Sequence, residues 1–295
     1  MAGKIAYVLA GGGAKGAFQL GVMQALDKQG VKPDLLIGTS VGALNSVGYA
    51  WKGIQGATDI WLGIKSRESI LSISLWEKMK TLWRTGYYNM EPLRGILKDV
   101  ISGPPPANAP EAVACFVELY TGAVLYQSSR SKKFTVEKFR QYVEASAAIP
   151  LTMELPPNPD GPGILADGGV RERAPLRAAI DAGYETIYCI LNNPISVNML
   201  ETWKPTFPDI VTTGYRAIDV CQHECYVNDI RLCDQKNNDP TKKKIDLKVF
   251  APDKLLIDTI QFEPGPIRAA IAQGNEAKQV PRERFYDFAK PTWED

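Results

Sequence analysis

A serine between two glycines is the feature of this sequence that points most directly to chemistry. The stretch "GTSVG" places Ser40 between Gly38 and Gly42, after an apolar run and before small residues that favour a helix. In that context a G-x-S-x-G pattern is typical of a serine nucleophile on a sharp strand-to-helix turn. A serine hydroxyl is a poor nucleophile unless a base accepts its proton. The pattern therefore predicts Ser40 as a nucleophile and requires a base elsewhere in the chain.

The identity of that base is less obvious, because the chain contains one histidine. His223 lies in "CQHEC", within a segment expected to be helical, whereas catalytic residues are concentrated on loops. A carboxylate is the alternative: "GILADGGV" ends an apolar run at Asp167, and Gly168 and Gly169 allow a tight exit. Burial would raise the pKa of this carboxyl and make it a stronger base. An ordinary Asp-Gly-Gly surface turn is the interpretation that this motif alone leaves open.

A glycine-rich loop near the start of the chain is the second candidate for a functional site. The stretch "GGGAKG" at 11–16 formally matches G-x-G-x-x-G. A dinucleotide site needs an acidic residue at the end of the next strand, but Asp34 precedes that strand. A P-loop needs Gly-Lys followed by Ser or Thr, but here Lys15 precedes Gly16 and Ala17 follows. Both nucleotide-binding interpretations therefore fail on the placement of residues.

Considered together with Ser40, the glycine loop suits an oxyanion hole. Neighbouring parallel strands end at the same edge of a sheet, so we expect the loop and Ser40 to be close. Backbone N–H groups aimed at a developing oxyanion contribute roughly 3 kcal/mol each. We expect Gly12 and Gly13 to donate these bonds, with the amide of Val41 as a further candidate. Lys15 either strengthens the positive field or is a solvated surface charge, and a turn needed only for tight packing is the alternative for the loop alone.

Cysteines around the histidine raise the question of a metal site. Cys221, His223, Cys225 and Cys233 follow the spacing C-x-H-x-C-x7-C, which is not that of common structural zinc sites. Cys221 and Cys225 share one helix face, which favours small apolar residues in a core. We expect no metal and no cofactor, and the odd total of five cysteines does not indicate a disulfide framework.

These residues lie on an alternating pattern of strands and helices. Apolar runs at 4–10 and 33–40 are each followed by helix-forming residues, which favours parallel strands with right-handed crossovers. We expect an α/β fold with three layers (α/β/α), a mostly parallel central sheet, and a single domain over 1–295. A helical insertion at about 51–103 interrupts the pattern. Further expected elements are two strands around Thr121-Gly122, a helix at 135–150, a strand ending at Asp167, a helix at about 209–234 and a late helix near 265–279.

Composition excludes some classes of function. The 295 residues are 45% hydrophobic, which is ample for a large core. With 34 basic and 33 acidic residues the net charge is +1, so neither nucleic-acid binding nor adhesion to anionic membranes by bulk charge is indicated. The apolar run at 5–10 is too short for a signal peptide, and no stretch is long enough to span a membrane. We expect a cytoplasmic or peripheral membrane protein, with signal-independent export left open.

Four ordered motifs resemble those of the patatin-like phospholipases: "GGGAKGAF", "GTSVGAL", "ASAAIP" and "DGGVRERAP". The resemblance extends over about residues 4–278 and departs at 51–103 and 196–245. It implies the patatin-like α/β fold, a Ser–Asp dyad in place of a triad, and lipid acyl esters as substrates. By this resemblance Ser40 is the nucleophile and Asp167 the base. The oxyanion loop would contain Gly11, Gly12, Gly13 and Gly16.

The sequence therefore predicts a serine hydrolase that cleaves fatty-acyl ester bonds of lipids through an acyl-enzyme. Phospholipase A, lysophospholipase and general lipid acyl hydrolase activities are all compatible with it. A catalytically silent lipid- or partner-binding protein on the same fold is the alternative. The expected partner is a lipid or acyl-ester substrate with peripheral membrane contact, and the oligomeric state is not indicated.

An aromatic stripe inside the expected insertion is a candidate for that membrane contact. Trp76, Met79, Leu82 and Trp83 recur at helical spacings among basic residues. This pattern fits an amphipathic surface helix that forms part of a mobile cap over the acyl pocket. Packing of the same stripe on the core fits it equally well.

Overall fold

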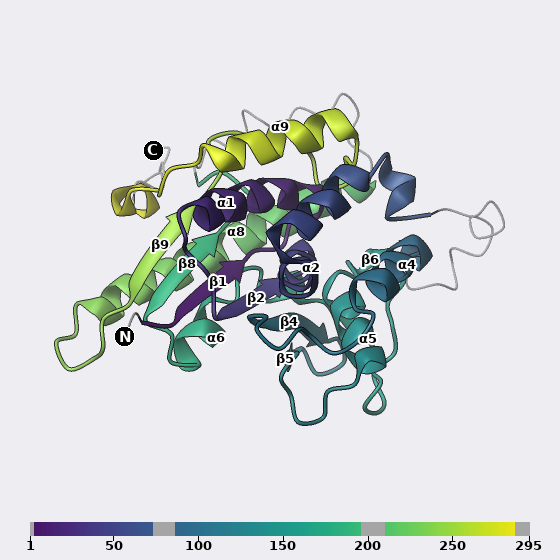
Figure 1. The fold of residues 1–295 in the computed structure, drawn as a ribbon, viewed down its shortest axis with the longest axis horizontal. Coiled ribbons are helices and arrows are strands. Elements are labelled where there is room, and N and C mark those ends of the chain that lie inside the picture. The colour runs from purple at the N-terminus through teal and green to yellow at the C-terminus, as the bar shows by residue number, and fades with distance from the viewer. Residues whose placement is uncertain (1–2, 73–85, 196–209, 287–295) are drawn as a thin grey trace, which may run out of the picture.

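A computed structural model describes residues 3–72, 86–195 and 210–286 of the chain. A central sheet runs through the molecule in the order β5-β4-β2-β1-β8-β9, and β7 pairs with β4 beside this path (Figure 1). Strands β4, β2, β1, β8 and β9 are parallel, and β5 and β7 run antiparallel to β4. The strands are β1 (Ile5–Leu9), β2 (Leu35–Thr39), β4 (Glu111–Glu118), β5 (Ala123–Ser128), β7 (Leu165–Asp167), β8 (Thr186–Ile190) and β9 (Asp246–Phe250).

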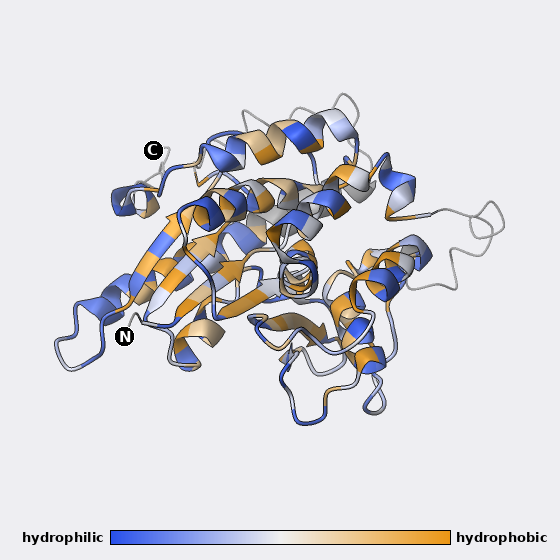
Figure 2. Cartoon of the chain, viewed as in Figure 1, coloured by the Kyte–Doolittle hydropathy of each residue, from blue (hydrophilic) through white to orange (hydrophobic). Residues whose placement is uncertain are grey.

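The central strands are apolar on both faces because helices cover both. In β1, Tyr7 and Leu9 belong to one buried cluster, and Ala6 and Val8 belong to another on the opposite face. This alternation follows from the period of two in a strand. Continuous apolar runs are what a parallel sheet buried on both sides requires, and Figure 2 shows the strands largely in the hydrophobic colour.

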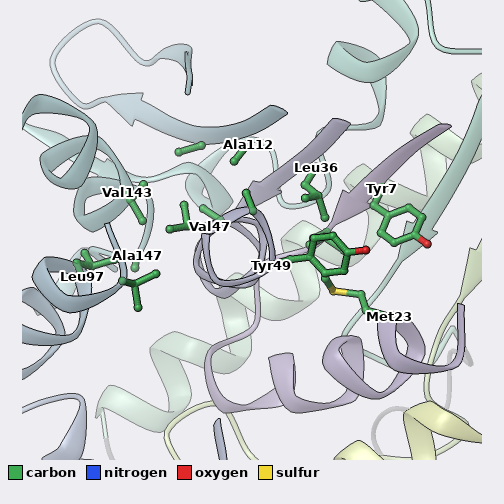
Figure 3. Close-up of a cluster of buried hydrophobic side chains, with 14 of the residues drawn as sticks. Tyr7, Met23, Leu36, Val47, Tyr49, Leu97, Ala112, Val143 and Ala147 are labelled. Atoms are coloured by element: carbon green, nitrogen blue, oxygen red, sulfur yellow. The ribbon is translucent and has the colours of Figure 1, made fainter. Parts of the chain in front are cut away.

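The helices form the two outer layers. On the Tyr7 face lie α1 (Gly16–Lys28), α2 (Val41–Gly63), α4 (Glu91–Val100) and α5 (Val136–Ser146). On the opposite face lie α6 (Leu176–Asp181) and α8 (Ile210–Asn237), while α9 (Pro264–Asn275) packs against α1. Figure 3 shows the cluster on the first face, where Tyr7 and Leu36 from the sheet meet Met23, Val47 and Tyr49 from α1 and α2. The three-layer α/β/α arrangement predicted from the sequence is confirmed.

The expected insertion at 51–103 is mostly helical where the structure describes it. Helix α2 continues to Gly63 with a kink at Gly53, a short 3-10 turn covers Arg67–Ser69, and α4 follows. It also contains strand β3 (Gly86–Tyr88), which pairs with β6 (Leu151–Met153). The sequence analysis did not predict β3, because three residues are too few to show a strand periodicity. The role of 51–103 as a cap and the extent of a single domain over 1–295 stay predictions.

Two further expectations bear on membranes. The aromatic stripe of Trp76, Met79, Leu82 and Trp83 lies outside the described residues. Within residues 3–72, 86–195 and 210–286, no helix is both long enough and apolar enough to cross a bilayer.

Candidate active site

Two strands meet end to end at the centre of the site. Strand β2 pairs with the first half of β4 and ends with Thr39 opposite Cys115. Strand β7 pairs with the second half, antiparallel, and ends with Asp167 opposite Phe116. Because β5 occupies the other edge of β4 along this stretch, β2 and β7 share one edge and point toward each other. Ser40, the residue after Thr39, therefore faces Asp167.

Ser40 lies on a sharp turn between β2 and α2. Its backbone has φ 57° and ψ −126°, outside the comfortable range of a residue with a side chain. The turn is held by Ser146 at the end of α5. The Ser40 N–H donates to Ser146 Oγ at 2.9 Å, and the Ser146 hydroxyl donates to the Cys115 carbonyl at 2.6 Å. This chain of bonds stabilises a backbone conformation that would otherwise be costly.

The two glycines around Ser40 are required by the closeness of the turn. A Cβ on Gly42 would lie 2.1 Å from the carbonyl oxygen of Leu9, and a Cβ on Gly38 would lie 2.2 Å from the Gly42 carbonyl carbon. Any side chain at either position would push α2 away from the sheet. The G-x-S-x-G pattern thus fixes how closely the helix that follows Ser40 approaches β1.

The carboxyl group of Asp167 lies within hydrogen-bonding distance of Ser40. The Ser40 hydroxyl hydrogen-bonds to the carboxylate, and the Gly169 N–H donates to Asp167 Oδ1 at 2.7 Å. The side chain is buried, and this desolvation raises the pKa of Asp167 to about 6. The bonds from Ser40 and Gly169 and the positive charge of Arg173 oppose that rise. A carboxylate with this pKa is mostly ionised at neutral pH and is a stronger base than an exposed aspartate.

Arg173 connects the Asp167 turn to the glycine loop. The Gly11 N–H donates to the Arg173 carbonyl at 2.9 Å, and Arg173 Nε donates to the Gly11 carbonyl at 3.0 Å. On the other side of the loop, the Ala14 N–H donates to the Thr259 carbonyl at 2.8 Å. These bonds fix the glycine loop relative to Ser40 and Asp167 from both sides. A Cβ on Gly168 would lie 2.5 Å from the Cys115 carbonyl oxygen, so the turn after Asp167 is also tightly packed.

Two amides of the glycine loop have no hydrogen-bond acceptor among the described residues. Among the described residues, neither the Gly12 N–H nor the Gly13 N–H is hydrogen-bonded, and both glycines line a pocket with Ser40. Gly13 has φ 57° and lies against Thr259, where a Cβ would be 2.1 Å from the carbonyl oxygen. The amides of Gly11 and Gly16 are already engaged, by the carbonyls of Arg173 and Gly13 respectively. Gly16 instead lets α1 approach Val41 closely.

Lys15 is buried rather than solvated. Its side chain is 2% exposed, and its Nζ donates to Asn193 Oδ1 at 2.9 Å. The interpretation of Lys15 as a solvated surface charge is therefore wrong. Because Asn193 follows β8, this bond ties the glycine loop to the end of a third strand.

Two pockets meet at Ser40. The larger encloses about 920 Å³, including space open to solvent, and extends between α2 and α4. Its walls are almost entirely apolar, as Leu44, Trp61, Ile96 and Met153 illustrate. The smaller, of about 470 Å³, has a mixed lining, in which Ile149, Pro150 and Val170 lie beside the glycine loop and the polar side chains of Asp167, Arg173 and Gln222. An ester bound at Ser40 can therefore place an apolar chain in the larger pocket and polar atoms of its alcohol part near Asp167 and Arg173 in the smaller one.

Comparison with known proteins identifies the family. A family model described as patatin-like phospholipase matches residues 7–180, which is more than half of the chain. This chain belongs to the patatin-like phospholipases. The matched region includes Ser40, Asp167 and the glycine loop, and the resemblance inferred from the four sequence motifs is confirmed.

Several curated relatives of this patatin-like chain are lysophospholipases. It is 29% identical over 194 residues to lysophospholipase NTE1 of Phaeosphaeria nodorum and 28% identical over 189 residues to that of Saccharomyces cerevisiae. Each match covers 63% of this chain, but only 12% and 10% of those proteins. Among solved structures, VipD from Legionella pneumophila matches with a TM-score of 0.46 and 14% identity over 93% of this chain and 65% of that one.

The lone histidine of this patatin-like protein does not lie beside Ser40 and Asp167. His223 lies in α8 with Nδ1 2.5 Å from Tyr226 Oη, and among the described residues it lines neither pocket at Ser40. Cys221 and Cys225 are exposed and Cys233 is buried, so the expectation that Cys221 and Cys225 are core residues is wrong. No group of three or more His, Cys, Asp or Glu side chains that could hold a metal occurs in the described ranges.

Sequence reasoning assigned no role to two residues that shape the site. Ser146 lies in "ASAAIP" and Arg173 in "DGGVRERAP", both quoted motifs of the resemblance. For Ser146, a single polar residue in an otherwise apolar motif was the available signal, whereas Arg173 is one of four charged residues in its motif and nothing local distinguished it. Their partners, Ser40 and Gly11, lie 106 and 162 positions away, so the contacts themselves could not be read from the chain.

Proposed function

We propose that this protein hydrolyses fatty-acyl esters of lipids through an acyl-enzyme on Ser40, with Asp167 as the base. The observation that carries the proposal is the hydrogen bond from a strained, buried Ser40 to a buried Asp167 where an apolar pocket meets a pocket of mixed lining. Membership of the patatin-like phospholipases and similarity to NTE1 lysophospholipases support a lipid substrate.

In the first half of the reaction, Ser40 Oγ attacks the ester carbonyl carbon as its proton passes to Asp167. Negative charge develops on the carbonyl oxygen, where the N–H groups of Gly12 and Gly13 are suited to donate, with Val41 as a third candidate. The positive end of α2 points to the same place. Collapse of the intermediate breaks the bond to the alcohol oxygen, which takes the proton from Asp167.

In the second half, a water molecule attacks the acyl-enzyme and gives its proton to Asp167. The resulting intermediate releases the fatty acid, and the proton returns to Ser40. No charged group other than Asp167 is needed for these transfers, so a raised pKa in that carboxyl matters directly. The apolar pocket between α2 and α4 suits the acyl chain, and the smaller pocket, whose mixed lining includes Arg173, suits the alcohol side of the ester.

Hydrolysis assays with three proteins test this proposal. Wild type should release fatty acid from lysophospholipid and from a soluble nitrophenyl ester, whereas Ser40→Ala should lose activity on both by at least about a thousandfold. His223→Ala should retain most of the activity. A silent lipid-binding protein on the same fold would show no turnover with either substrate, and a Ser40→Ala variant with wild-type activity would exclude Ser40 as the nucleophile.

A further inference from the structure

Leu151 is exposed and strained beside the active site. Its side chain is 83% exposed, and its backbone has φ 67°. Within the described residues, Ser40 is the one other non-glycine residue with a positive φ. Leucine is disfavoured in this backbone region and gains nothing from exposure to water. Neither the backbone conformation nor the burial of apolar surface explains a leucine at this position. This points to a contact between Leu151 and another molecule.

The location of Leu151 suggests what that contact is. It directly follows Ile149 and Pro150, which line the smaller pocket at Ser40. Val170 lines the same pocket and is 46% exposed. The two segments are joined by a hydrogen bond from the Asp167 N–H to the Ala148 carbonyl, at 2.8 Å. One exposed apolar side chain, Val170, thus lines the pocket at Ser40, and a second, Leu151, directly follows two residues that line it.

An exposed cation follows Val170 in the chain, and it contacts a turn that carries an exposed aromatic residue. Arg171 is exposed, follows Val170, and donates from Nη1 to the Gly122 carbonyl in the turn between β4 and β5. That turn carries Tyr120, which is 72% exposed. Apolar side chains with a neighbouring tyrosine and a basic residue are typical of surfaces that enter the interfacial region of a lipid layer. The net charge of +1 gives the whole chain little attraction to such a layer.

We propose that Leu151, Val170 and Arg171 form a lipid-contacting rim that holds the opening of the active site against a membrane or micelle surface. This inference rests on the proposed function, since it assigns the lipid substrate as the occupant. Leu151 and Val170 enter the apolar layer, and Arg171 contacts lipid phosphates. The acyl chain can then move from the lipid layer to the apolar pocket past Ile149, which lines both pockets, with little exposure to water.

Vesicle binding tests the rim without requiring catalysis. In a Ser40→Ala background, Leu151→Asp and Val170→Asp should each weaken co-sedimentation with phosphatidylcholine–phosphatidylglycerol vesicles by about tenfold. Each variant no longer buries a leucine or valine side chain in the lipid layer. Leu232→Asp is the matched control, since Leu232 is a 58% exposed leucine on α8. Its binding should be unchanged. Arg171→Gln should weaken binding to these anionic vesicles more than to pure phosphatidylcholine.

A second variant separates the rim from a structural role. Leu151→Asn should fold at least as stably as wild type, because asparagine tolerates a positive φ, yet it should bind vesicles as weakly as Leu151→Asp. In the active protein, both Leu151 variants should lose about tenfold on vesicle substrate and stay within about twofold on a soluble ester. Unchanged vesicle binding by Leu151→Asp and Val170→Asp would overturn the rim. Absence of esterase activity in wild type would instead refute the proposed function, while the binding comparison would still decide the rim.

Discussion

Replacing Asp167 with asparagine should separate catalysis from stability at one side chain. Asparagine keeps the shape of the residue, and its Oδ1 can still accept the bond from the Gly169 N–H. It cannot take the proton of Ser40, so hydrolysis of a soluble ester should fall by at least about a hundredfold. The backbone and both pockets should be unaffected, because the substitution adds no volume.

The same substitution should stabilise the fold at neutral pH. Burial raises the pKa of Asp167 from 3.8 to about 6, so between pH 4 and 6 the folded protein binds this proton more tightly than the unfolded chain does. Raising the pH through this window therefore favours unfolding. Two pKa units at about 1.4 kcal/mol each correspond to roughly 3 kcal/mol lost by wild type between pH 4 and 7. The asparagine side chain does not titrate. The free energy of unfolding of the variant, relative to that of wild type, should therefore rise by that amount between pH 4 and 7.

Urea unfolding at pH 4, 5, 6 and 7 measures this difference directly. The free energy of unfolding of Asp167→Asn minus that of wild type should rise across the series. Asp253→Asn, which changes an exposed aspartate, is the control and should give a flat difference. A flat difference for Asp167→Asn would mean that burial does not raise the pKa of this carboxyl. Esterase activity near that of wild type would mean that Asp167 is not the base.

Four further outcomes are expected. Ser146→Ala removes the acceptor of the Ser40 N–H and should lower kcat about tenfold and the free energy of unfolding by about 1–3 kcal/mol. A kcat and a urea unfolding curve identical to those of wild type would contradict this. Arg173→Gln removes a positive charge that lowers the pKa of Asp167, so the acid limb of the pH profile of kcat/KM should move from near pH 6 to higher pH. An acid limb at the same pH as in wild type would show that Arg173 does not lower this pKa. Ile96→Trp narrows the apolar pocket and should reduce hydrolysis of a palmitoyl ester about tenfold more than that of a butyryl ester; equal losses would place the acyl chain elsewhere. Dialysis against EDTA should leave activity on a soluble ester intact, and loss that calcium or zinc restores would indicate a metal-dependent step.

The residues proposed for the chemistry could be predicted from the sequence because each ends an apolar run at glycines. Ser40 follows β2, and Asp167 ends β7. Apolar runs of this kind have few alternatives to a buried strand, and the glycines that follow mark where each strand turns. The fold class followed from the same alternation of strands and helices.

Several features depended on contacts that no local pattern contains. The antiparallel direction of β7 brings Asp167 to Ser40, yet three residues cannot indicate a direction. Lys15 looks exposed in sequence because lysine rarely is buried, and its partner Asn193 is 178 positions away. The exposed cysteines of α8 were misassigned because spacing alone shows that Cys221 and Cys225 share a face but not which way it points.

Covalent labelling with a fluorophosphonate tests the central claim most directly. The reagent reacts with a serine that a neighbouring base activates, and peptide mass spectrometry locates the adduct. Wild type should carry one adduct, on Ser40, while Ser40→Ala should carry none and Asp167→Asn should react far more slowly. An unlabelled wild-type protein, or an adduct on another residue that abolishes hydrolysis, would contradict an acyl-enzyme on Ser40.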